Sequence, residues 1–338
     1  MKYAVIMYLE SDNIGDDIQT YATLKYLPRV DYVIDREEVN NFTCNSPVKA
    51  ILNGWFMFNN INWPPSENID VLPISIHFAT TYFKNEYEKK LFEYRTKKYF
   101  SNFNSIGCRD VGTSKYLSSI GINNYISKCL TLTLDRLNIE PAKEKYICAV
   151  DLDDVEYKKL QSMTDIKIKK MSHDYRGRNL NLLTFEERMK KVEEFLKIYQ
   201  NAYCVVTTRY HAALPSIALG TPVILIPSRF EPSRYDGLEE YVNLILRKDF
   251  ISEDYKYDFD NLKSNSDISE IKKSLENACY QFINDDFRKI NYSKEELEDM
   301  YVELLKKYES LQEETSINKK LNYYTNLDLD KYVEDNLE

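Results

Sequence analysis

The chain has 338 residues, 43% hydrophobic and 29% charged, so it has a globular composition and is long enough for two α/β domains with an extension. Its net charge of −9 excludes a general binder of nucleic acid or anionic membranes, and any anionic ligand must therefore meet local positive charge. The six scattered cysteines form no CxxC pair, which predicts a reducing, cytoplasmic location and no zinc site. No run of 18 apolar residues occurs, so we expect no transmembrane segment and at most peripheral membrane contact.

The first part of the chain alternates apolar runs with amphipathic segments. Strands are predicted at 3–9, 32–34, 50–56, 71–78 and 105–110. Helices are predicted at 16–27, 85–100 and 113–120, the first ended by Pro28 and the last by Gly121. This alternation indicates a parallel sheet that is covered by helices on both faces.

After a polar segment at 136–145, which we interpret as a linker, the alternation starts again. Strands are predicted at 146–152, 166–173, 204–207 and 223–226. Helices are predicted at 155–162, 185–202, 212–219 and 238–246. The predicted fold is α/β, with two doubly wound Rossmann-like domains, 1–135 and 146–262, that face each other across a cleft. Ligands of such sheets bind beyond the carboxyl ends of the strands, so the cleft is the expected site.

Residues 263–338 have a different pattern, of C-terminal helices and an acidic tail. A predicted helix at 268–284 is followed by the capping box Ser293-x-x-Glu296, which begins a second, long helix. Apolar side chains recur along it at alternating spacings of four and three, at Leu297, Tyr301, Leu304, Tyr308 and Leu311. Such a stripe is typical of a surface helix packed on its own domain, or of a coiled-coil seam that would form a homo-oligomer through the C-terminal helices.

The strand-to-helix junction after residue 204 carries the clearest chemical signal. Arg209 and His211 follow the apolar strand CVVT and are two residues apart, so both can point to the mouth of the sheet. The free N–H groups of a helix N-terminus lie at this position and favour an anion. The pair therefore predicts a phosphate or carboxylate site. The alternative is a helix cap at His211 and a salt bridge at Arg209.

Two further loops place arginine at predicted strand ends. Arg229 and Arg234 follow the strand at 223–226, and Arg109 ends a strand on the other side of the cleft. Three arginine-bearing strand ends in an acidic protein favour a small, strongly anionic substrate. The alternative for each arginine is pairing with a nearby carboxylate, which for Arg109 would be Asp110.

The first strand-to-helix turn contains Asn13, Gly15, Asp16 and Asp17. With one glycine it does not match the GxGxxG fingerprint of a dinucleotide site. One or both aspartates are expected to cap the following helix. A carboxylate that faces the cleft would instead bind acceptor hydroxyls or act as a base.

In order along the chain, these features resemble the polysaccharide pyruvyl transferase family. The segments that carry the resemblance are NIGDDIQTYA (13–22), NGWF (53–56), SIHF (75–78), GCRDVGTSKYL (107–117), CLTLTL (129–134) and RYHAALPSIALGTPVI (209–224). The resemblance implies a fold similar to the two-domain B-type glycosyltransferases (GT-B-like). It also implies transfer of pyruvate from phosphoenolpyruvate to a pair of sugar hydroxyls as a ketal, with release of phosphate, in the synthesis of a surface polysaccharide or another glycan.

On the donor side, the resemblance assigns phosphoenolpyruvate binding to Arg109, Arg209, His211 and Arg234, with Arg229 as the competitor of Arg234. His211 would be the general acid that protonates the methylene carbon, because a histidine gives and takes a proton near neutrality. The arginines would stabilise the leaving phosphate. No metal or other cofactor is required.

On the acceptor side, the resemblance implies a glycan carried on a lipid or a nucleotide. His77 lies in one of the family-like segments, and we expect it near the acceptor together with Asn13, Gly15, Asp16 and Asp17. A structural role is the alternative for His77.

Three other interpretations stay open. A B-type glycosyltransferase would have the same fold and would use Arg209 and His211 to hold a nucleotide-sugar. Asp151-x-Asp153 matches the first motif of haloacid-dehalogenase-type phosphatases and the metal-binding DxD of A-type glycosyltransferases, although a strand end followed by a helix cap gives the same spacing. The third interpretation is a binding or scaffold subunit that uses its C-terminal helices.

Overall fold

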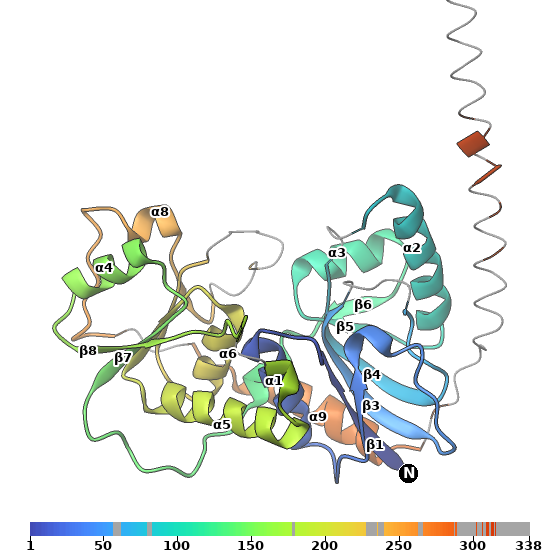
Figure 1. Ribbon diagram of the computed structural model, residues 1–338, viewed down its shortest axis with the longest axis horizontal. Helices are drawn as coiled ribbons and strands as arrows, with labels where there is room; N and C mark the ends of the chain where they lie inside the picture. The colour runs from blue at the N-terminus through green and yellow to red at the C-terminus, as the bar shows by residue number, and fades with distance from the viewer. Residues whose placement is uncertain are drawn as a thin grey trace, which may run out of the picture.

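The strands of the computed structural model form two separate parallel sheets, which lie in two lobes (Figure 1). The structure describes residues 1–56, 62–79, 83–177, 180–227, 235, 240–262, 266–286, 288 and scattered positions between 302 and 315. Arg229, Arg234 and the five residues of the predicted C-terminal stripe lie outside this part of the chain. Within it, no helix is both long and apolar enough to cross a membrane.

The first sheet has the strand order β2-β1-β3-β4-β5-β6. Its strands are β1 Lys2–Met7, β2 Tyr32–Asp35, β3 Val48–Phe56, β4 Ile69–Phe78, β5 Ile106–Cys108 and β6 Asn124–Ile126. The helices of this lobe are α1 Ile14–Leu24, η1 Arg36–Glu38, α2 Glu86–Phe100 and α3 Val111–Ser119. The central strands β3 and β4 are buried along almost their whole length, as expected of parallel strands covered on both faces.

The second sheet has the strand order β11-β10-β9-β7-β8, and its pairs are also parallel. Its strands are β7 Tyr146–Val150, β8 Lys167–Met171, β9 Cys204–Thr207, β10 Val223–Leu225 and β11 Asn243–Leu244. Its helices are α4 Asp154–Ser162, η4 Leu180–Leu182, α5 Phe185–Asn201, α6 Tyr210–Ala218 and α8 Arg247–Phe250. The chain is therefore α/β with two Rossmann-like domains, as predicted.

Two short strands differ from the prediction. The helix predicted at 238–246 is wrong for Asn243–Leu244, which extends the sheet as β11 because Ile245 N–H donates to the Leu225 carbonyl and the pair runs parallel to β10. The strand β6 was not predicted at all. It pairs with β5 at the sheet edge, and its three residues are half-buried or exposed, so it has no apolar signal.

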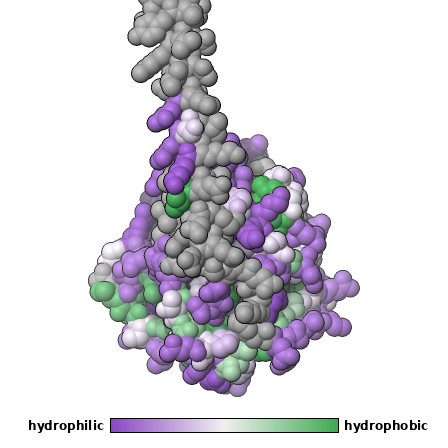
Figure 2. All heavy atoms as spheres, turned by 90° about the vertical axis from the view of Figure 1, so that its right-hand side faces the viewer, coloured by the Kyte–Doolittle hydropathy of each residue, from purple (hydrophilic) through white to green (hydrophobic). Residues whose placement is uncertain are grey.

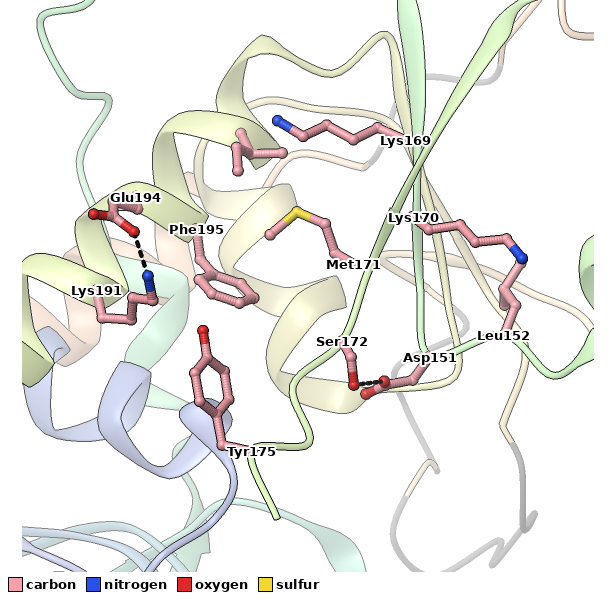
Figure 3. Close-up of a pocket in the computed structure, with 11 residues that line it drawn as sticks. Asp151, Leu152, Lys169, Lys170, Met171, Ser172, Tyr175, Lys191, Glu194 and Phe195 are labelled. Atoms are coloured by element: carbon pink, nitrogen blue, oxygen red, sulfur yellow. Dashed lines mark hydrogen bonds and ion pairs between the residues drawn. The ribbon is translucent and has the colours of Figure 1, made fainter. Parts of the chain in front are cut away.

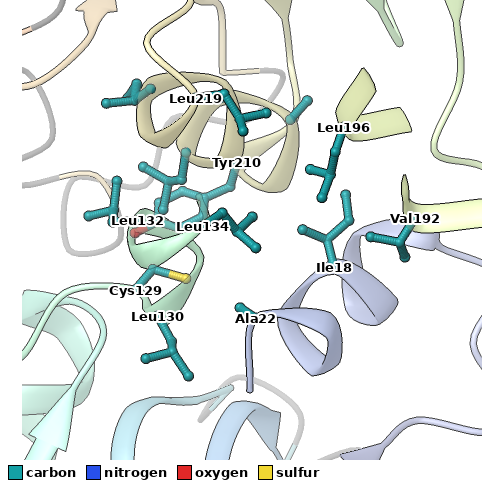
Figure 4. Close-up of a cluster of buried hydrophobic side chains, with 14 of the residues drawn as sticks. Ile18, Ala22, Cys129, Leu130, Leu132, Leu134, Val192, Leu196, Tyr210 and Leu219 are labelled. Carbon is teal, nitrogen blue, oxygen red and sulfur yellow. The ribbon is translucent and has the colours of Figure 1, made fainter. Parts of the chain in front are cut away.

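The two domains share one hydrophobic core. Helix α1 of the first domain contacts α5 and α6 of the second, and the turn η3 Leu130–Thr133, just before the predicted linker, packs against α1 and α6. Figure 4 shows the side chains that meet there: Ile18 and Ala22 from α1, Leu130, Leu132 and Leu134 from the η3 region, Val192 and Leu196 from α5, and Tyr210 and Leu219 from α6 or its end. The junction is thus a packed core, while the residue limits of the domains stay a prediction.

The last well-described helix, α9 Ser269–Asn284, returns to the first domain and lies near α1 at the junction (Figure 1). Its C-terminal end is held by Lys49 on β3, whose Nζ donates to the carbonyls of Phe282 and Asp285 at 2.5 Å each. The helix therefore ties the end of the second domain back to the first sheet. On the side of the molecule that Figure 2 shows, which is the right-hand side of Figure 1, the described surface is mainly hydrophilic, with small hydrophobic patches.

Candidate functional site

Arg109 lies between the end of β5 and the start of α3, where it faces the second domain. Its backbone N–H donates to the carbonyl of Ile76, which fixes it beside β4, and its side chain is buried. Nη1 donates to Gln19 Oε1 at 3.2 Å, and the guanidinium carbon lies 5.3 Å from the ring centre of Tyr210. Among the described residues Nε makes no hydrogen bond, although it forms the predicted alternative ion pair with Asp110, whose Oδ2 lies 3.6 Å away. A buried guanidinium with an unused donor is the kind of group that a bound anion satisfies.

His77 and Asp110 form a close pair beside this arginine. His77 is the last residue but one of β4, and Asp110 caps α3 by accepting from Thr113 N–H. The Nδ1 atom of His77 lies 2.6 Å from Asp110 Oδ2. Burial alone would raise the pKa of Asp110, but the hydrogen bond with His77 and the nearby Arg109 guanidinium outweigh it and lower that pKa to about 2. Asp110 is therefore ionised at neutral pH and fixes the orientation of the His77 ring.

Arg209 is the N-cap residue of α6, but its side chain makes no capping hydrogen bond. Instead Nε donates to Asp151 Oδ2 at 2.6 Å, while 41% of the side chain stays exposed. The salt bridge that was the alternative interpretation of Arg209 is thus present, but the side chain is still accessible to solvent.

The Asp-x-Asp spacing is divided between two different structures. Asp153 caps α4 in a reciprocal capping box with Glu156 and pairs with Arg247, whereas Asp151 turns toward Arg209. The Asp153 carboxylate therefore belongs to a helix cap, and the Asp151 carboxylate belongs to the surroundings of Arg209. Within the described ranges, no three His, Cys, Asp or Glu side chains gather as a metal-binding group.

His211 lies in the first turn of α6 and is buried against the first domain. Its Nε2 is 3.8 Å from Cys129 Sγ, and its ring packs edge-on against Tyr210, with centroids 5.3 Å apart. Its Cβ lies so near Gly15 that a Cβ at Gly15 would be only 3.2 Å away. His211 is thus enclosed by the start of α1 on one side and by Cys129 on the other.

The turn before α1 supplies the first-domain wall. Asn13 caps α1 by accepting from Gly15 N–H at 3.0 Å, so the prediction of an aspartate cap is wrong. Asp16 accepts from Ser11 Oγ at 2.7 Å and lies 3.4 Å from Arg36 Nη1. Three of the four residues predicted here, Asn13, Gly15 and Asp16, therefore lie together in the turn that begins α1.

Asp17 lies elsewhere, inside the domain interface. It is fully buried, and its two carboxylate oxygens accept from Arg188 Nε at 2.9 Å and Nη2 at 2.7 Å. Burial raises the pKa of Asp17 to about 6, in spite of these hydrogen bonds. Its position therefore gives it a part in joining α1 to α5.

His173, which follows β8, also belongs to the interface. Its carbonyl accepts from Ile14 N–H at 3.1 Å, beside an isolated antiparallel bridge between Asn13 and Asp174. Its Nε2 lies 2.5 Å from the Tyr199 hydroxyl. Burial lowers the pKa of His173 to about 3, so the ring is neutral at physiological pH.

Four of the predicted residues are thus linked across the domain junction: His77, Arg109, Arg209 and His211. Asp17 belongs to the interface instead, and Arg229 and Arg234 lie outside the described residues. His77 contacts Asp110, Arg109 stacks on Tyr210, and Tyr210 is flanked by Arg209 and His211. Sequence reasoning missed Asp151 and Cys129 as the partners of Arg209 and His211, since each partner is distant in the chain. Such a group can bind an anion with two arginines and can move a proton at a histidine.

Comparison with known proteins gives one strong match. A sequence profile of the family described as polysaccharide pyruvyl transferase matches residues 13–229, more than half of the chain. No curated relative matches the chain significantly.

Similar solved structures share little sequence with this chain. A functionally uncharacterised protein from Klebsiella pneumoniae is 17% identical, with a TM-score of 0.45, and the match covers 72% of this chain and 92% of that protein. UDP-GlcNAc 2-epimerase from Methanocaldococcus jannaschii is 12% identical, with a TM-score of 0.41 and coverage of 90% of this chain and 99% of that protein.

The family match includes residues from both halves of the site, from the Asn13 turn through Arg109 to the junction that carries Arg209 and His211. The chain is therefore a transferase and belongs to the polysaccharide pyruvyl transferase family.

Proposed function

We propose that this enzyme transfers the pyruvyl group of phosphoenolpyruvate to two hydroxyls of a glycan acceptor, forming a ketal and releasing phosphate. The observation that carries the proposal is the burial of Arg109 against Tyr210 of the Arg209-Tyr210-His211 segment, with an Nε that makes no hydrogen bond among the described residues. Two arginines and a histidine from facing domains suit a donor with a carboxylate and a phosphate.

On the donor side, the exposed guanidinium of Arg209 and the unused donor of Arg109 would hold the two anionic groups. His211 would give its proton to the methylene carbon of the donor, which makes C2 electrophilic. One acceptor hydroxyl then adds to C2, and the second displaces phosphate as the C2–O bond breaks. One of the two hydroxyl protons restores His211, and the other leaves with phosphate. Arg234 or Arg229 completes the donor site in this proposal.

On the acceptor side, we assign His77 to the glycan hydroxyls. Its Nδ1 is held by the ionised Asp110 at 2.6 Å, as in a histidine that an aspartate orients for proton transfer. Asn13, Gly15 and Asp16 lie in the turn that begins α1, which Gln19 links to Arg109, and would contact the same sugar. The carrier of that sugar, a lipid or a nucleotide, would extend away from this turn.

A binding experiment separates this proposal from a nucleotide-sugar transferase. Isothermal calorimetry should show that phosphoenolpyruvate binds the protein in the absence of UDP-GlcNAc, which could itself bind only as a nucleotide-linked acceptor. Arg209→Ala should abolish that binding, while Arg176→Ala, which removes an arginine with an 80% exposed side chain, should leave it unchanged. Binding of the nucleotide-sugar without phosphoenolpyruvate would favour the glycosyltransferase.

Turnover tests the proton donor. Phosphate release from phosphoenolpyruvate would be followed with a panel of glycosides that present hydroxyl pairs of different geometry. His211→Ala and Arg209→Ala should each abolish release while leaving the circular dichroism spectrum unchanged. Turnover near the wild-type rate in either variant would refute the assigned site.

A further inference from the structure

Arg209 depends on one side chain for its direction. Its Nε–H donates to Asp151 Oδ2 at 2.6 Å, and among the described residues its two terminal nitrogens make no hydrogen bond. A guanidinium held only through Nε still presents both terminal nitrogens, which is the pair of donors that grips a carboxylate or phosphate. Asp151 therefore holds Arg209 through Nε and leaves the two terminal nitrogens, Nη1 and Nη2, for a ligand.

Asp151 is itself held in an unusual conformation. Its φ is 53°, in the left-handed region that residues other than glycine rarely adopt, at the point where β7 ends. Its N–H donates to the Met171 carbonyl at 3.1 Å, and its carbonyl accepts from Thr208 Oγ1 at 2.9 Å. These backbone contacts fix the residue from both neighbouring strands.

The carboxylate of Asp151 joins three segments of the second domain. Oδ1 accepts from Ser172 Oγ at 2.5 Å, and Oδ2 accepts from His173 N–H at 3.1 Å as well as from Arg209. Figure 3 shows the contact with Ser172, beside a hollow of about 660 Å³ that Asp151, Ser172 and one face of α5 line. The end of β7, the loop after β8 and the start of α6 are thus locked together by one acid.

We propose that Asp151 is a positioning residue of this transferase, which aims the terminal nitrogens of Arg209 at the anionic end of the donor. The proposal rests on the proposed function of the Arg209 site. A left-handed φ and a charge-assisted hydrogen bond are more than a strand end needs, since the neighbouring Asp153 caps its helix with ordinary backbone angles. Loss of the carboxylate would let the Arg209 side chain move among rotamers and weaken donor binding.

The test uses Asp151→Asn and Asp151→Gly in the full chain. Glycine adopts a φ of 53° without strain, so Asp151→Gly removes the carboxylate while favouring the same backbone. We expect the KM and the calorimetric Kd for phosphoenolpyruvate to rise about tenfold to a hundredfold in both variants. Asp153→Asn is the matched control, because it removes the carboxylate of another Asp–Arg pair two residues away, and its KM should stay at the wild-type value.

Chemical rescue distinguishes positioning from a structural role. The hollow beside Asp151 gives small anions a route to the vacated carboxylate position, so added formate should restore phosphoenolpyruvate affinity in Asp151→Gly and leave wild type unaffected. Unfolding of Asp151→Gly, or affinity that formate does not restore, would overturn the positioning role. Unchanged affinity in both variants would overturn it too. Wild-type protein that does not bind phosphoenolpyruvate would overturn the proposed function and this role together.

Discussion

Asp17 of the first domain and Arg188 of the second form a buried, two-pronged ion pair across the domain junction. Arg188 Nε and Nη2 lie 2.9 and 2.7 Å from the two carboxylate oxygens, and the other Arg188 donors reach the carbonyls of Tyr8 and Leu9. The guanidinium thus satisfies both the carboxylate and the end of β1. Because the pair joins α1 to α5, it couples the stability of the junction to the geometry of the site beside it.

Arg188→Met should destabilise the protein strongly. Methionine keeps the length of the side chain but leaves the Asp17 carboxylate buried without its partner, and removing one member of such a pair costs about 3–5 kcal/mol. The free energy of unfolding would be measured by urea denaturation. Arg176→Met is the control, because Arg176 pairs with Asp174 at the surface with 80% of its side chain exposed, and its loss should cost at most about 1 kcal/mol. Equal losses in the two variants would contradict the assignment of Asp17 and Arg188 as an interface clamp.

Gly15→Ala should strongly reduce the rate of phosphate release while lowering the free energy of unfolding only modestly. A Cβ there would lie 3.0 Å from Asn13 Oδ1, 3.2 Å from His173 Nδ1 and 3.2 Å from His211 Cβ. Overpacking of this kind costs about 1–3 kcal/mol, part of which alanine regains by its higher helix propensity. The displacement falls on His211, so phosphate release should drop at least tenfold. A variant with wild-type kcat and KM would show that the contact between Gly15 and His211 has no role.

His173→Gln should change how stability depends on pH. In the unfolded chain His173 takes up a proton as the pH falls through about 6.5, whereas in the folded chain it stays neutral down to about 3. Unfolding therefore takes up a proton in this window, and His173 lowers the free energy of unfolding by up to about 1.4 kcal/mol for each pH unit below 6.5. Glutamine can still contact the Tyr199 hydroxyl but carries no titrating group.

The measurement is the stability difference between wild type and His173→Gln. It should shrink by about 2 kcal/mol between neutral pH and about pH 5. The raised pKa of Asp17 acts in the opposite direction, since the folded chain binds that proton first, but it is common to both proteins and cancels in the difference. Parallel pH curves for the two proteins would contradict a buried, neutral His173.

Much of the fold could be predicted because parallel strands are continuous apolar runs. The predicted strands at 3–9, 204–207 and 223–226 correspond to β1, β9 and β10, all of them largely or fully buried. The edge strands β6 and β11 could not be predicted in this way. Each pairs with one neighbouring strand only, and its residues are half-buried or exposed, so the sequence shows no apolar run there. The shared core at the domain junction was also beyond prediction, since periodicity shows that a helix has an apolar face but not which domain covers it.

The positions of the main site residues could be predicted from the sequence, but the side chains that contact them could not. Arg109, Arg209 and His211 lie where strands become helices, and that position is visible in the sequence. Their partners Gln19, Asp151 and Cys129 are 90, 58 and 82 residues away in the chain, so only the folded structure brings them together. The Asp-x-Asp spacing shows the same limit, because its two carboxylates look alike in sequence and serve different structures.

Lys49→Met should release α9 from the first domain. The Lys49 side chain is fully buried on β3, and its Nζ donates to the Phe282 and Asp285 carbonyls at the end of the helix and lies 4.7 Å from the Phe282 ring centre. The last carbonyls of a helix lack partners within the helix, and leaving the buried Phe282 carbonyl without Lys49 costs about 1–3 kcal/mol. Methionine fills the same volume, so the loss is not one of packing.

Urea denaturation and limited proteolysis within α9 would check this prediction. Lys2→Met is the matched control on the neighbouring strand, because Lys2 pairs with Asp31 at 3.3 Å with 45% of its side chain exposed and should contribute less than about 1 kcal/mol. Faster cleavage of α9 in Lys49→Met than in Lys2→Met would show that the lysine anchors the helix. If both variants unfold at the same urea concentration as wild type, the anchor is supplied by the apolar contacts of Leu275 and Phe282 with the junction core instead.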